Sequence, residues 1–149
     1  MYRRILVAID GSDVAARALQ HGLALAGVLG STVTIVHVAE MTSPPIDVHA
    51  AAAGARLPPL SVVPEDMQAS SNRLLERAKE VAATAGIEAK TLLVEYRRPA
   101  EGIVEAAILE SAELIVMGTN GRRGLSRMVL GSQTNTVLQH TNVPVLVTR

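Results

Sequence analysis

Cysteine, phenylalanine and tryptophan are all absent from this 149-residue sequence. The absence of cysteine excludes disulfides, thiolate metal sites and cysteine nucleophiles, and it fits a protein of a reducing compartment. Tyr2 and Tyr96 are the only aromatic residues, so the chain has almost no rings on which single-stranded nucleic acid could stack. We therefore expect no nucleic-acid partner.

An excess of one charge and a long apolar run are also missing. The 14 Lys and Arg residues balance the 14 Asp and Glu residues, so recognition of an anion would have to be local. No stretch of about 18 apolar residues exists, which predicts no membrane span. The apolar run that follows Arg4 ends at Asp10, before the roughly seven residues that a signal peptide needs. We expect a cytoplasmic protein without a membrane partner, and the length favours one domain over residues 1–149.

Five strand-like runs alternate with four segments of helical spacing. The predicted strands span residues 4–9, 32–38, 89–95, 114–117 and 143–147, and the predicted helices span 13–29, 65–85, 99–108 and 133–140. This alternation predicts an α/β fold with an open, five-stranded parallel sheet, Rossmann-like, and helices on both faces. We expect the strand order 3-2-1-4-5. In the helix that begins at Pro99, the spacing predicts Ile103, Val104, Ala107 and Ile108 as inward positions.

Three features between these elements have more than one interpretation. Residues 41–64 hold five of the seven prolines, which predicts a long flexible insertion across or beside the mouth of the sheet. His37 lies inside a strand, where a lone histidine is more often a hydrogen-bonded core residue than a ligand. The pair Arg97 and Arg98 could bind phosphate, although solvated arginines are the commoner case.

The most informative stretch runs from Gly118 to Ser132. It follows a buried strand and leads into a helix, and its spacing is Gly118-x2-Gly121-x9-Gly131-Ser132. Glycines allow close approach of the backbone to a ligand, and the amides at a helix N-terminus favour an anion. There is no Gly-Lys pair for a Walker A loop, and glycines three apart do not match the dinucleotide fingerprint. The stretch is therefore either a phosphate-binding loop or a flexible surface loop.

The expected sheet order favours the first alternative. Ligands of open parallel sheets bind beyond the carboxyl ends of the strands where the winding direction reverses. With strands one and four as neighbours, Asp10 faces Gly118 at that point. A carboxylate suits sugar hydroxyls, and helix N-terminal amides suit phosphate.

These pieces together resemble the universal stress protein family, specifically its ATP-binding branch, over the whole length of the chain. The resemblance is carried by the start Ile5 to Ser12, by Val36-His37-Val38, by Ile115 to Gly118, by the glycine spacing and by Asn142 to Val147. It implies an adenine nucleotide alpha hydrolase-like fold. Two departures are Asn120, where the family often has histidine, and Arg97-Arg98-Pro99, where a glycine before the proline is common.

The resemblance also implies roles for individual residues. Asp10 would hold the ribose or adenine side, Ala8 would line the pocket, and the backbone of Val38 would meet adenine. The loop would wrap ribose and phosphates, and the following helix start would offer N–H and hydroxyl groups to the phosphates: Gly118, Thr119, Asn120, Gly121, Arg122, Arg123, Gly124, Gly131, Ser132, Gln133 and Thr134. The ligand would be ATP, or ADP or AMP, and any Mg or Mn would bind mainly through its phosphates.

The leading interpretation is an ATP-binding stress-response or signalling protein that acts through its conformation or through partners that the sequence does not identify. A slow ATP hydrolase is the second, although phosphoryl transfer needs a held metal and a positioned nucleophile, and no catalytic residues stand out. The third is a structural dimer that binds no nucleotide. We also expect a homodimer through the strand at 143–147, because an uncharged apolar edge invites pairing.

Overall fold

Strands and helices alternate along the chain in the computed structural model, which describes residues 1–40, 65–96, 98–119 and 131–149. The elements are β1 (Arg4–Ile9), α1 (Asp13–Leu29), β2 (Thr32–Glu40), α3 (Glu65–Thr84), β3 (Ala89–Tyr96), α4 (Pro99–Leu109), β4 (Leu114–Gly118), α5 (Ser132–His140) and β5 (Val145–Thr148). The predicted insertion at 41–64 lies outside the described residues. None of the described helices is long and apolar enough to cross a membrane.

The five strands form one parallel sheet in the order β3-β2-β1-β4-β5, as predicted. β1 is central and pairs with β2 on one side and with β4 on the other. The chain therefore winds outward from β1 in one direction through β2 and β3, and in the other through β4 and β5. The point of reversal lies between β1 and β4.

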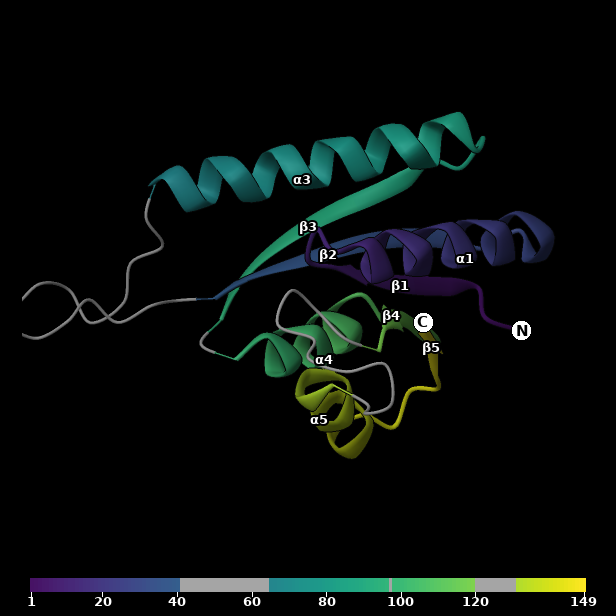
Figure 1. The fold of residues 1–149 in the computed structure, drawn as a ribbon. Coiled ribbons are helices and arrows are strands. Elements are labelled where there is room, and N and C mark those ends of the chain that lie inside the picture. Colours follow the sequence, from purple (N-terminus) through teal and green to yellow (C-terminus); the bar gives the residue numbers. More distant parts are fainter. Residues whose placement is uncertain (41–64, 97, 120–130) are drawn as a thin grey trace, which may run out of the picture.

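Helices cover both faces of the sheet, which confirms the predicted fold class (Figure 1). Ile5, Val7 and Ile9 of β1 belong to the core cluster that α1 and α3 cover. Leu6 and Ala8 alternate with them and join the cluster beneath α4 and α5. Successive side chains of a strand point to opposite faces, so a continuous apolar strand fills both clusters.

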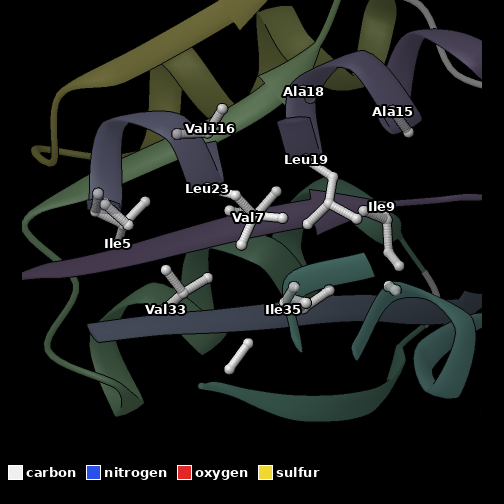
Figure 2. Packing of buried hydrophobic residues seen from close by; sticks show 14 of the residues in the cluster. Ile5, Val7, Ile9, Ala15, Ala18, Leu19, Leu23, Val33, Ile35 and Val116 are labelled. Atoms are coloured by element: carbon white, nitrogen blue, oxygen red, sulfur yellow. The ribbon is translucent and has the colours of Figure 1, made fainter. Parts of the chain in front are cut away.

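Small residues let α1 pack close to the sheet. A Cβ atom on Gly22 would lie 2.7 Å from Cγ2 of Val7, too close for an unshifted contact. Leu19 and Leu23 lie beside Val7 in the same cluster (Figure 2). The helix begins where the Ser12 hydroxyl accepts a hydrogen bond from the Ala15 amide, and it ends at a left-handed Gly30.

Two predictions of the sequence are wrong. The last strand begins at Val145, not at Val143, and it runs to Thr148. The Val143 amide donates to the Thr141 hydroxyl in a local turn instead of joining the sheet, and Pro144 has no amide to donate. In α4, Ile108 is 71% exposed and does not face the core. That helix is apolar on nearly all sides, so spacing alone does not select its buried face.

Candidate functional site

The reversal point of the sheet brings together segments that lie more than a hundred residues apart. β1 and β4 pair in register from Ile5 opposite Leu114 to Val7 opposite Val116. Asp10 directly follows β1 and Thr119 directly follows β4, so both lie at the carboxyl edge of the sheet. The predicted meeting of Asp10 with the start of the glycine loop is therefore present in the topology.

Asp10 is half-buried and closes the turn from β1 into α1. Its Oδ1 atom accepts a hydrogen bond of 3.0 Å from the Ser12 amide. Ala8 and Val38 lie on the α4 and α5 face of the sheet, together with the buried Met117. These three apolar side chains therefore lie on the same face of the sheet, near the edge where Asp10 follows β1. The expected strand order predicts Met117 and Gly118 opposite the end of β1, and the structure has Met117 in the same cluster as Ala8.

Backbone hydrogen bonds hold the two ends of the glycine loop together. The Gly131 amide donates to the Thr119 carbonyl at 2.8 Å, and the Thr119 amide donates to the Thr148 carbonyl at 2.8 Å. The predicted loop residues Asn120, Gly121, Arg122, Arg123 and Gly124 lie outside the described residues. What the structure describes is the base of the loop.

The side chain of Thr134 ties the same base from the other side. Thr134 is 2% exposed, and its Oγ1 atom lies 2.9 Å from the Gly118 carbonyl and 3.0 Å from the Thr119 carbonyl. A hydroxyl has one proton to donate, and here two backbone oxygens share it. The Thr134 hydroxyl therefore positions the base of the loop, and in this arrangement its proton is not available to a ligand.

The N-terminus of α5 has no side-chain cap among the described residues. Gly131 occupies the N-cap position, whereas α1 is capped by the Ser12 hydroxyl. The first bond from the start of α5 runs from the Asn135 amide to the Gly131 carbonyl at 2.9 Å. The three preceding amides have no partner within the helix, and with the helix dipole behind them they favour an anion. This donor set fits the phosphates of a nucleotide.

Gln133 has a role that the sequence did not indicate. Its Oε1 atom accepts a hydrogen bond of 3.0 Å from the Ala100 amide, in the first turn of α4. The side chain of Arg98 makes no cap there. Gln133 thus links the starts of α4 and α5, a contact between positions 33 residues apart that no local spacing signals.

The glycine at position 118 has a packing role of its own. A Cβ atom there would lie 2.7 Å from Cγ1 of Val14 and 3.2 Å from its carbonyl carbon. The first turn of α1 therefore requires a glycine at the end of β4. Close approach to a ligand is not needed to explain this residue.

His37 and Arg98 have structural partners. His37 is buried, and its Nδ1 atom lies 2.9 Å from the Ile9 carbonyl, which confirms the core interpretation. The carbonyl can only accept, so Nδ1 carries the proton in this contact. Arg98 is exposed and pairs with Glu101 at 3.1 Å, as expected for a solvated arginine. Arg97 lies outside the described residues, and no group of three or more His, Asp or Glu side chains among those described could hold a metal ion.

The model of the universal stress protein family matches residues 1–149 of the chain. A universal stress protein of Thermus aquaticus is 36% identical, with both chains covered completely. The solved universal stress protein of Lactobacillus plantarum has a TM-score of 0.78 at 24% identity and covers 99% of this chain and 98% of its own. A universal stress protein of Archaeoglobus fulgidus, solved in complex with dAMP, has a TM-score of 0.67 at 25% identity and covers 99% and 98%.

The sheet order and the layered helices agree with the solved universal stress proteins, and the sequence match extends from the first residue to the last. The chain belongs to the universal stress protein family.

Proposed function

We propose that this universal stress protein binds an adenine nucleotide, with ATP as the working ligand, at the edge where β1 and β4 end. It acts in a stress response or in signalling through its conformation or its partners. The observation that carries the proposal is the N-terminus of α5, which no described side chain caps and which lies beside the end of β4 on the same edge as Asp10. The dAMP complex of the Archaeoglobus relative supports an adenine nucleotide as the ligand.

The polar groups at this edge divide between the two ends of a nucleotide. The Asp10 carboxylate suits ribose hydroxyls, Ala8 lines the pocket, and the backbone of Val38 meets adenine. The amides at Ser132, Gln133 and Thr134 receive the phosphates, with the loop from Gly118 to Gly124 and Gly131 around them. A divalent cation, Mg or Mn, would bind mainly through the phosphates, whose charge it would neutralise.

Nucleotide retained by the purified protein tests the proposal directly. Mass spectrometry of the supernatant after denaturation should detect an adenine nucleotide in about equimolar amount, and calorimetry should rank ATP, ADP and AMP. A protein that releases no nucleotide and gives no heat with any of the three would refute the proposal. Phosphate release over many turnovers would replace it with the hydrolase alternative.

We also propose a homodimer through β5 and a cytoplasmic location for a single domain of residues 1–149. β5 pairs only with β4 in the described sheet, so its other side is an edge. Leu146 on this edge is 38% exposed. Pairing of two copies about a two-fold axis would satisfy the free backbone groups and bury this side chain.

Sedimentation tests the dimer with a matched pair of variants. The wild-type protein at micromolar concentration should have about twice the monomer mass, and Leu146→Lys should lower it because a charge at the edge opposes pairing. Val81→Lys is the control, since Val81 is 45% exposed on α3, which packs over β2 and β3. A wild-type monomer, or equal behaviour of the two variants, would contradict an interface at β5.

A further inference from the structure

A groove of about 490 Å³ lies between α4 and α5 on the outer side of the molecule. Its lining includes Val104, Ile108 and Leu109 from α4, with Thr136 and His140 from α5. The two helices lie side by side over one face of the sheet (Figure 1). The groove involves the second half of α5, away from the uncapped N-terminus of that helix.

The apolar side chains of this groove are exposed. Ile108 is 71% exposed and Leu109 is 70% exposed, although both are large aliphatic residues. Single exposed apolar residues are common on protein surfaces, but these two adjoin Val104 in one concave site. A concave apolar patch with polar surroundings is typical of a surface that a partner covers.

The carboxylates in the groove lining outnumber the cationic side chains that pair with them. Glu101 and Glu105 lie one helical turn apart in its lining, and neither α4 nor α5 contains lysine or arginine. Arg98 neutralises Glu101 in part, whereas Glu105 forms no ion pair with any described residue. An acidic rim disfavours nucleotides, nucleic acid and anionic membranes as occupants and favours a cationic one.

We propose that this groove docks a basic amphipathic helix of a partner protein. The apolar stripe of such a helix would cover Val104, Ile108 and Leu109, as in other helix-in-groove complexes. Its lysine or arginine residues would flank Glu101 and Glu105. The small contact surface suits a weak, reversible encounter of the signalling type. This docking does not depend on nucleotide binding.

Two synthetic helical peptides of about 16 residues, or about four turns, test the pairing. Both carry the same leucine stripe, one flanked by lysine and the other by glutamate, and each is titrated into the full chain by calorimetry. The lysine peptide should bind and the glutamate peptide should not, and a tenfold rise in salt should weaken the binding because the charges are exposed. Glu105→Lys should weaken binding of the lysine peptide by about fivefold.

The apolar part of the proposal has its own variant and control. Ile108→Ser should weaken the lysine peptide by about tenfold or more, because Ile108 would be buried by the partner. Val28→Ser, at an exposed apolar position on α1, should leave the affinity unchanged. Circular dichroism should show wild-type helix content for both variants, since neither residue is in the core. Equal binding of the two peptides, no binding of the lysine peptide, or equal losses in Ile108→Ser and Val28→Ser would overturn the proposal.

Discussion

Removing the Thr134 hydroxyl tests whether the base of the glycine loop is held by a side chain. Thr134→Val keeps the shape of the residue but takes the donor away from the Gly118 and Thr119 carbonyls, which lie 2.9 and 3.0 Å from Oγ1. A typical hydrogen bond contributes about 1 kcal/mol net, and the Gly118 carbonyl, which loses this donor at a part-buried position, adds part of its desolvation cost. The Thr119 carbonyl keeps the Gly131 amide as a donor. We expect the free energy of unfolding to fall by about 1–2 kcal/mol.

Thr136→Val is the matched control in the same helix. The Thr136 hydroxyl donates to the Ser132 carbonyl within α5, at a more exposed position. Its loss should change the free energy of unfolding by less than about 0.5 kcal/mol. Threonine and valine have similar helix propensities, so this contribution is nearly equal in the two variants. Urea unfolding measures the difference, and thermal midpoints should fall by about 2–8 °C for Thr134→Val.

ATP affinity separates positioning from general stability. Without the Thr134 hydroxyl, ATP binding would have to order the base of the loop at its own cost in free energy, so the dissociation constant for ATP of Thr134→Val should rise by up to about tenfold. Thr134→Ser keeps the hydroxyl and loses a methyl group, which costs about 1 kcal/mol of stability but should leave ATP binding as in the wild type. Equal unfolding midpoints for Thr134→Val and Thr136→Val would refute the tether. Equal ATP affinities for the Thr134→Val and Thr134→Ser variants would show that the Thr134 hydrogen bonds do not contribute to ATP binding.

Three further predictions concern the site and the packing beside it. Gly131→Glu should abolish ATP binding in calorimetry, whereas Gly131→Ala should retain it. The φ of −59° at this position suits any residue, and only the glutamate brings a negative charge to the phosphates. Equal ATP binding by both variants would show that the N-terminus of α5 is not part of the site. Asp10→Ala should weaken ATP more than pyrophosphate in competition assays, and equal losses would contradict a nucleoside-side role. Gly22→Ala should lower the free energy of unfolding by about 1–2 kcal/mol through its overlap with Val7. Gly27→Ala, whose added Cβ atom would lie 3.8 Å from Cδ1 of Ile87, should raise the free energy of unfolding by up to about 1 kcal/mol in urea titrations. A Gly22→Ala variant as stable as Gly27→Ala would contradict the close packing of α1.

The fold could be predicted from the sequence because its signals are local and agree with one another. β1 is a continuous apolar run, which is typical of a strand that is covered on both faces. The residues that break it, from Asp10 to Ser12, also start α1, and Gly30 ends that helix. The position of the candidate site then followed from strand order alone, since the reversal between β1 and β4 fixes which loops meet.

The contacts that position the site could not be predicted in the same way. Gln133 reaches Ala100, and Gly118 accommodates Val14, across distances in sequence that no spacing rule covers. The direction of the Thr134 hydroxyl depends on the place of α5 relative to β4, which is a tertiary property. The outward face of α4 is a similar case, because Ile108 fits either side of an apolar helix until the packing of the helix is known.

The glycine motif and the structure give different reasons for the same residues, and the difference bears on function. At Gly118 the missing side chain is required by Val14, so this glycine would be needed in a protein that bound no nucleotide. At Gly131 the backbone is unstrained, with φ of −59° and ψ of 149°, so its backbone conformation gives no reason for the glycine. No described side chain caps α5 at Gly131, and the three amides that follow have no partner within the helix, which is the stronger indication of a phosphate ligand. Among the described residues, the proposed site offers backbone amides and one strand-end carboxylate, which are groups that bind and orient a nucleotide.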